Sequence, residues 1–183
     1  DLSMSLDQIG PLTKNVKDAA LILNIIKGED KKDPTTFSSE EIRIKNQEKI
    51  KLGVLKLKNI DKKIESLISE KITEIKNNLN FSVKEVELKY IDLAVQTYYL
   101  LVYVEFFSTT RRFDGRKYGK KIEDNCGVEV LRRILGGSEI TKAEFKGAYY
   151  KKALEVKEAI KEEFESMFKE IDCLILPTVP SLP

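Results

Sequence analysis

The sequence predicts an α/β fold that is rich in helix, and three observations support this prediction. A short apolar strand, a long amphipathic helix and a second strand follow one another between residues 52 and 88, which is the order of a βαβ unit. Two later stretches, 90–107 and 141–169, have the apolar content and length of helices. A content of 42% hydrophobic and 34% charged residues is typical of a globular chain rather than a disordered one.

The first element is a turn followed by a helix. Gly10-Pro11 breaks the preceding extended stretch, because glycine permits unusual φ values and proline fixes its own. Thr13 or Asn15 can then cap a helix. Its apolar residues cover a broad face, which predicts a helix that packs against a core: Ala19, Leu21, Ile22, Leu23, Ile25 and Ile26.

Residues 28–36 contain glycine, proline and several charges, and we expect a loop there. Ser38 and Glu41 have the spacing of a capping box, so the polar stretch that runs to Gln47 is predicted as a short helix or a linker.

The βαβ unit comes next. Residues 52–57 are predicted as a short buried strand, and residues 83–88 as a second strand after Asn77-Asn78. Between them, apolar residues recur at helical spacing for five turns: Ile60, Ile64, Leu67, Ile68, Ile72, Ile75 and Leu79. Because strand, helix and strand follow directly, the two strands should pair in parallel.

The second half of the chain is mainly helical. Residues 90–107 are apolar and aromatic without strand alternation, which predicts a buried helix. Residues 128–135 predict a short helix that ends at Gly136-Gly137. Gly136-Gly137-Ser138 is similar to a piece of a catalytic Gly-Ser loop, but it lacks a second glycine pair and is predicted as a linker between two helices.

The last two elements are a helix and a strand. Thr141 and Glu144 have capping-box spacing and predict the start of a helix that runs to about Lys169. Residues 173–176 form a short apolar strand that Pro177 ends.

Composition excludes several classes of function. A net charge of +2, from 32 basic and 30 acidic residues, gives no electrostatic basis for nucleic-acid binding. The sequence has no histidine, which excludes Ser-His-Asp and Cys-His sites. Cys126 and Cys173 are far apart and lack metal-ligand spacing, so we expect reduced thiols in a cytoplasmic protein and no metal site. No apolar run reaches the roughly 18 residues of a membrane-spanning helix, so no membrane partner is expected.

The string Ser5-Leu-Asp-Gln-Ile-Gly-Pro11, followed by Val16 and Asp18-Ala-Ala20, resembles the segment that follows the nucleophile region in amidase signature hydrolases. Other stretches resemble the same family in the same order: Thr97-Tyr98-Tyr99 with Arg112-Phe113-Asp114-Gly115 and Tyr118-Gly119, Glu129-Val130 with Arg132 to Gly136, Ala148 to Ala153, and Asp172 to Pro180. The version with Gln8-Ile9 is most similar to the glutaminase subunits of tRNA-dependent amidotransferases.

This resemblance implies that residues 1–183 are part of one amidase signature domain, cut at both ends, with a mixed sheet flanked by helices. It also implies a catalytic Lys and two catalytic Ser residues that lie before residue 1 in family order. We therefore expect no catalytic residue in this chain and no amidase activity from the chain alone.

By the same resemblance, Tyr99 and Arg133 contact the substrate glutamine. The chemistry suits these residue types, since arginine offers a fork of donors to a carboxylate and tyrosine offers a hydroxyl. Without the resemblance, Tyr99 would be a core residue and Arg133 a member of a surface ion pair.

The implied function of the whole protein is release of ammonia from glutamine. A partner subunit would use this ammonia, with ATP and Mg, to convert Glu-tRNA(Gln) to Gln-tRNA(Gln). The chain itself would then hold no cofactor, and tRNA would be bound through the partner subunit only. The alternatives are another amidase signature hydrolase that acts on a different amide, and a non-catalytic interaction module.

Overall fold

The computed structural model describes residues 2–34, 36–41, 49–77, 80–113, 115, 117 and 119–182. The chain forms two compact units. The larger unit combines Asp1–Asp7 with Lys49–Pro183, and the smaller unit is Gln8–Glu48.

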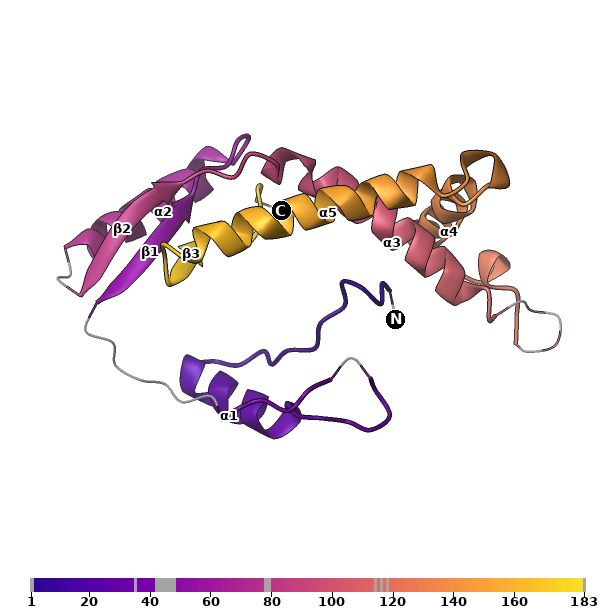
Figure 1. The fold of residues 1–183 in the computed structure, drawn as a ribbon, viewed down its shortest axis with the longest axis horizontal. Helices are drawn as coiled ribbons and strands as arrows, with labels where there is room; N and C mark the ends of the chain where they lie inside the picture. Colours follow the sequence, from indigo (N-terminus) through magenta and orange to yellow (C-terminus); the bar gives the residue numbers. More distant parts are fainter. Residues whose placement is uncertain are drawn as a thin grey trace. The chain divides into compact units, whose positions relative to one another are not determined.

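The larger unit contains a parallel three-stranded sheet with the strand order β2-β1-β3 (Figure 1). Its strands are β1 (Ile50–Leu55), β2 (Phe81–Val86) and β3 (Cys173–Ile175). In the register, Leu52 lies opposite Val83 on one side and opposite Cys173 on the other. The predicted parallel βαβ unit is confirmed, although β1 and β2 each begin two residues earlier than expected. The resemblance implied a mixed sheet, whereas all pairings among the described strands are parallel.

The crossover helix α2 (Lys62–Lys76) follows β1 and packs against β2. Asp61 caps its N-terminus by accepting a hydrogen bond from the backbone N–H of Lys63 at 2.8 Å. Ile72 of the predicted apolar stripe is buried. Asn78 and Leu79, which the sequence placed at the turn before the second strand and at the end of the helix, lie outside the described residues.

One aspartate adds to the pairing of strand β3 with β1. The Asp172 carboxylate accepts the backbone N–H of Lys51 at 2.8 Å, and the Asp172 N–H donates to the Lys51 carbonyl at the same distance. The two bonds extend the β1–β3 ladder by one residue beyond Leu52 and Cys173.

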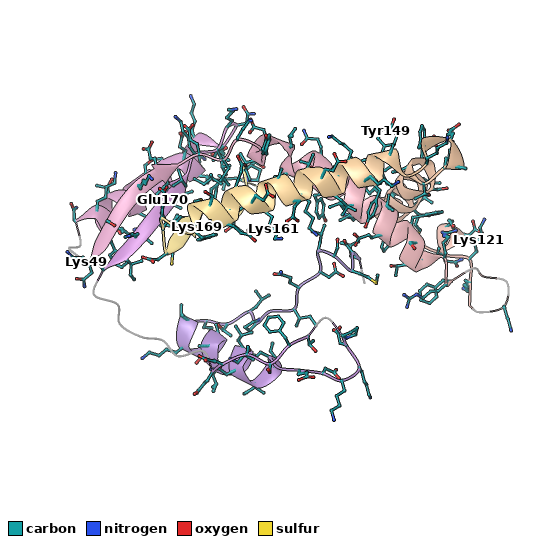
Figure 2. All side chains as sticks on the ribbon, viewed as in Figure 1. Lys49, Lys121, Tyr149, Lys161, Lys169 and Glu170 are labelled. Atoms are coloured by element: carbon teal, nitrogen blue, oxygen red, sulfur yellow. The ribbon has the colours of Figure 1, made fainter. Side chains whose placement is uncertain are left out.

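The rest of the larger unit is helical: the short 3₁₀ turn η1 (Ile91–Leu93), α3 (Ala94–Thr110), η2 (Ile122–Asp124), α4 (Val128–Ile140), η3 (Ala143–Phe145) and α5 (Ala148–Met167). Helix α3 packs against both α4 and α5, and its burial confirms the helix predicted over 90–107. In Figure 1, α5 spans the distance from the sheet to the α3–α4 pair. Figure 2 shows Tyr149 at the α4 end of α5, and Glu170 beside the sheet.

The larger unit has two apolar centres. One lies along α3, which packs against α4 and against α5, and contains Leu101, Val102, Ile134 and Ala153, each almost fully buried. The other contains Leu55, Leu88, Met167 and Ile171, from the sheet and the end of α5. Helix α5 contributes to both.

The glycine pair in α4 does not end the helix, so that prediction is wrong. Helix α4 continues through Gly136 and Gly137 to Ile140, and the pair is not a linker. A Cβ atom on Gly137 would lie 2.1 Å from the Tyr103 carbonyl oxygen and 2.4 Å from Phe107 Cβ. The glycines therefore allow the α3 and α4 backbones to approach closely, and the local preference of glycine for helix ends carries no information about this contact.

The predicted capping box at Thr141 and Glu144 is also wrong. Thr141 is the residue after α4, and its hydroxyl donates to the Gly137 carbonyl at 2.8 Å. Helix α5 begins only at Ala148, after Lys146 and Gly147 adopt left-handed conformations. The Thr141 hydroxyl thus caps the C-terminus of α4 and does not cap the N-terminus of α5.

The smaller unit contains α1 (Val16–Ile26), and Asn15 caps it by accepting from the Asp18 N–H at 2.9 Å, as the sequence predicted. No residue of α1 is buried, so its predicted role as a core helix is not confirmed. The loop that follows is closed by Thr36, whose hydroxyl accepts from the Asp30 N–H and donates to the Asp33 carbonyl, each at 2.8 Å. The short helix or linker predicted up to Gln47 lies largely outside the described residues.

Within the described parts of the chain, none of the helices has the length and apolar character needed to cross a membrane.

Candidate substrate-binding site

The two residues singled out from the sequence lie on neighbouring helices of the larger unit. Tyr99 is on α3 and Arg133 is on α4, and these two helices pack closely along their length. Tyr98, Tyr103, Glu129 and Arg132 complete a group of six side chains that we call the Tyr–Arg cluster.

Arg133 is mostly buried, with 17% of its side chain exposed. Its Nε donates to Glu129 Oε1 at 3.0 Å. Its Nη1 is buried and has no hydrogen-bond partner among the described residues. Hydrogen bonding to the Tyr98 hydroxyl, together with the Glu129 carboxylate, raises the pKa of Arg133 above its ordinary value. A buried cationic donor without an acceptor costs about 1–3 kcal/mol or more.

Arg132 is oriented by the same carboxylate. Its Nε donates to Glu129 Oε2 at 2.9 Å and its Nη2 donates to Glu129 Oε1 at 2.7 Å, which makes a bidentate pair. Its Nη1 donates to the Tyr103 hydroxyl. The guanidinium carbon lies 5.4 Å from the centre of the Tyr99 ring, within the range of a cation–π contact.

The three tyrosines form a continuous aromatic row along α3. The ring centres of Tyr98 and Tyr99 are 5.3 Å apart, and those of Tyr99 and Tyr103 are 5.5 Å apart. Tyr99 is 37% exposed, so it is not a core residue. The structure thus pairs Tyr99 with Arg132 and Tyr98 with Arg133, and both arginines share Glu129.

The alternative interpretation of Arg133, as a member of a surface ion pair, holds only in part. The ion pair with Glu129 exists, but the arginine is largely buried and keeps one donor without a partner in the described structure. Glu129, Tyr98 and Tyr103 were not predicted as site residues. The spacing of Glu129 to Arg132 and Arg133, three and four residues along a helix, is the sequence signal that could have identified the shared carboxylate.

The cluster can bind an anion beside an aromatic wall, but it carries no nucleophile activated by a base. Guanidinium groups remain protonated and only donate, so Arg133 can hold a carboxylate and cannot abstract a proton. Among the described residues, no group of three or more His, Cys, Asp or Glu side chains could hold a metal ion. Cys126 and Cys173 are not joined by a disulfide. Asp114 and Tyr118, which belong to the quoted motifs, lie outside the described residues.

The sequence model of the family described as Amidase matches residues 1–183. The A subunit of the glutamyl-tRNA(Gln) amidotransferase of Methanococcus maripaludis is 49% identical over 184 aligned residues, which cover 100% of this chain and 43% of that protein. The protein of the same name from Methanocaldococcus jannaschii is 48% identical and is covered to 42%. The chain therefore spans about two fifths of the length of the curated relatives it matches.

Solved structures agree with the sequence comparisons. The crystal structure of the corresponding A subunit from Thermotoga maritima has a TM-score of 0.74 and 30% identity, over 98% of this chain and 38% of that one. A crystal structure described as an amidase has a TM-score of 0.77 at 22% identity, over 100% of this chain and 37% of that one, which supports the fold alone. The match of the family model along the whole chain, together with the shared fold, shows that the chain belongs to the amidase signature family.

Proposed function

We propose that this chain is part of the glutaminase subunit of a glutamyl-tRNA(Gln) amidotransferase. The observation that supports this most strongly is 49% identity over the whole chain to the A subunit of such an enzyme. The complete subunit releases ammonia from glutamine through an acyl-enzyme. A partner subunit in the cytoplasm uses this ammonia, with ATP and Mg, to amidate Glu-tRNA(Gln), and it is the partner that binds the tRNA.

In this proposal the Tyr–Arg cluster binds glutamine. The buried Arg133 Nη1 has no acceptor within the described structure, and the α-carboxylate of an amino acid supplies one. Tyr99 is partly exposed and packs on the neighbouring Arg132 in the same cluster. Glu129 holds the Arg133 Nε, so the guanidinium is fixed before substrate arrives.

The chain's own contribution to the reaction is to bind and orient. The bond-breaking steps need a nucleophile and a base, which the family resemblance assigns to a Lys and two Ser residues that precede residue 1 in family order. We therefore expect the purified chain to release no ammonia from glutamine above the blank. Measurable release would contradict this assignment of the catalytic groups.

The test uses the complete subunit in its complex. Charge-assisted hydrogen bonds are worth about 1.5–3 kcal/mol each. Arg133→Ala should therefore lower kcat/KM for glutamine by roughly 10- to 100-fold, since 1.4 kcal/mol corresponds to about a factor of ten. Arg133→Lys should not restore it, because an ammonium group cannot reproduce both the bond to Glu129 and the bond to the carboxylate.

The control is Arg111→Ala. Arg111 also forms an ion pair with a glutamate, at 2.7 Å to Glu123, but it lies outside the cluster and should leave kcat/KM unchanged. Arg132 is not a neutral control, because its guanidinium packs on Tyr99 and shares Glu129. If Arg133→Ala and Arg111→Ala give the same kcat/KM as wild type, the cluster does not bind glutamine. If Arg133→Ala loses activity toward glutamine but still hydrolyses a neutral amide that has no carboxylate, the role of Arg133 as carboxylate ligand is supported.

A further inference from the structure

Glu105, on the face of α3 that meets α5, joins three separated parts of the chain. Its Oε2 accepts from the Ser3 hydroxyl at 2.6 Å and from the Ser5 N–H at 3.0 Å. Its Oε1 accepts from the Ser5 hydroxyl at 2.6 Å and from the Tyr150 hydroxyl of α5 at 3.1 Å. Both carboxylate oxygens are thus used twice.

The segment that Glu105 holds, residues 2–7, has a defined shape of its own. The Asp7 carboxylate accepts the N–H of Leu2 at 2.8 Å and that of Ser3 at 3.1 Å. The Asp7 N–H donates to the Ser3 carbonyl at 2.8 Å, which closes a turn. Lys157 of α5 donates from its Nζ to the Ser5 carbonyl at 3.1 Å, and Ser3 is fully buried.

An ionised carboxylate specifies this arrangement more strictly than apolar contacts would. It can only accept, so each of its neighbours must present a donor in a fixed direction, and such bonds are about twice as strong as neutral ones. Burial raises the pKa of Glu105, but the bonds from Ser3, Ser5 and Tyr150 outweigh it and lower the pKa overall. The group is therefore charged at neutral pH, and it fastens the segment at two serines that are two residues apart.

We infer that Glu105 is a positioning residue that fixes residues 2–7 relative to the Tyr–Arg cluster. Glu105 and Tyr99 lie on the same helix six residues apart, so the segment is anchored about 9 Å along the axis from Tyr99. This inference rests on the proposed function, in which the catalytic groups precede residue 1 in family order and the cluster binds glutamine. In that proposal Glu105 acts through residues 2–7, whose Ser3 and Ser5 it holds against α3.

The experiment uses the complete subunit in its complex and compares Glu105→Met with Glu105→Gln. Methionine fills a similar volume but accepts none of the four bonds. Glutamine keeps one oxygen for the Ser5 N–H, and the Ser5 and Tyr150 hydroxyls can rotate to accept from its amide. Glu155→Met is the matched control, because Glu155 lies on α5 in an exposed pair with Lys152.

Two readouts are measured. In Glu105→Met, amide hydrogen exchange of a peptide covering residues 2–7 should become at least about tenfold faster. The kcat for ammonia release should fall about 10- to 100-fold, as expected for a misplacement of about 1 Å. KM for glutamine should stay within about threefold, because Tyr99 and Arg133 are untouched. Glu105→Gln should recover most of kcat, and Glu155→Met should match wild type in both readouts.

The outcomes separate the inference from the proposed function. If Glu105→Met keeps the wild-type kcat although amide hydrogen exchange in residues 2–7 is faster, the inference is overturned and the proposed function stands. The same holds if amide hydrogen exchange in residues 2–7 is unchanged. If Glu105→Met does not fold, the Ser3→Ala/Ser5→Ala double variant decides, because it removes the two hydroxyl donors while leaving Glu105 and the helices intact. A lower kcat with faster exchange in that variant supports the inference, and wild-type values overturn it. A wild-type complex that releases no ammonia from glutamine overturns the proposed function and with it the catalytic part of the inference.

Discussion

The close approach of α3 and α4 at Gly137 is a sharp test of the fold, and Gly137→Ala is the smallest change that perturbs it. The added Cβ would lie 2.1 Å from the Tyr103 carbonyl oxygen and 2.4 Å from Phe107 Cβ. Close carbon–oxygen contacts between helices have separations of about 3.3 Å, so the two backbones must move apart by roughly 1 Å. Neither obstacle is the end of a flexible side chain that could turn away.

The expected loss of stability follows from two opposing effects. Alanine in a helix interior is favoured over glycine by about 1 kcal/mol. Overpacking of a tight core costs typically about 1–3 kcal/mol, and occasionally more. Because the contact here is with backbone, we expect the upper end of that range and a net destabilisation of about 2 kcal/mol. For a chain of this size, this corresponds to a fall in Tm of roughly 4–8 °C.

The assay is urea unfolding followed by circular dichroism, with Gly127→Ala as the control. Gly127 precedes the first residue of the same helix, has an ordinary φ of −73° and has open space around its Cβ position. Its substitution should cost no more than about 1 kcal/mol. If Gly137→Ala is as stable as wild type or more stable, the two helices do not cross at the described distance, and the explanation for the glycine pair is wrong.

Three further outcomes can be measured on the same chain. Asp172→Ala should lower the free energy of unfolding by about 1–3 kcal/mol, because the ladder loses the acceptor for the Lys51 N–H, and Asp172→Asn should be milder. Ile134→Ala should cost about 2–5 kcal/mol in the same unfolding assay, since Ile134 is almost fully buried between α3 and α4. The pKa of Glu105 is lowered in the folded state, so its stabilising contribution is present above the unfolded pKa near 4.5 and is lost as pH falls through the folded pKa. In urea unfolding between about pH 5 and pH 3, Glu105→Gln should therefore reduce the fall in the free energy of unfolding with decreasing pH. An unchanged pH dependence would contradict the hydrogen bonding at Glu105.

Much of the fold could be predicted from the sequence because the signals are long. The parallel βαβ unit follows from two apolar strands around a five-turn periodic helix, and α3 follows from an apolar and aromatic run without strand alternation. The predictions that prove wrong rest on short local sequence patterns. Gly136-Gly137 is typical of a helix end, and Thr141 with Glu144 is typical of a helix start, because both patterns describe local backbone preferences. The contact with Tyr103 and Phe107, which comes from the preceding helix α3, decides the outcome instead.

The candidate site, like the fold, could be predicted only in part. The family resemblance singled out Tyr99 and Arg133, and the structure puts both where α3 meets α4. The pairing within the cluster could not be predicted, because it depends on the rotation of α4 against α3. That rotation brings Arg132 to Tyr99 and Tyr103, and it leaves Arg133 beside Tyr98 with one donor that has no acceptor in the described structure.

Helix α3 explains why these features depend on one another. A helix with apolar residues on all sides must be covered on several faces, and α3 is covered by α4, by α5 and, through Glu105, by residues 2–7. It therefore carries Tyr99, the backbone that faces Gly137, and the carboxylate that holds the first residues of the described chain. Because these lie on one rigid helix, a change in the α3–α4 distance at Gly137 also moves Arg133 relative to Tyr99. The close contact at Gly137 thus sets the position of Arg133 relative to α3, and the Glu105 carboxylate sets the position of residues 2–7 relative to the same helix.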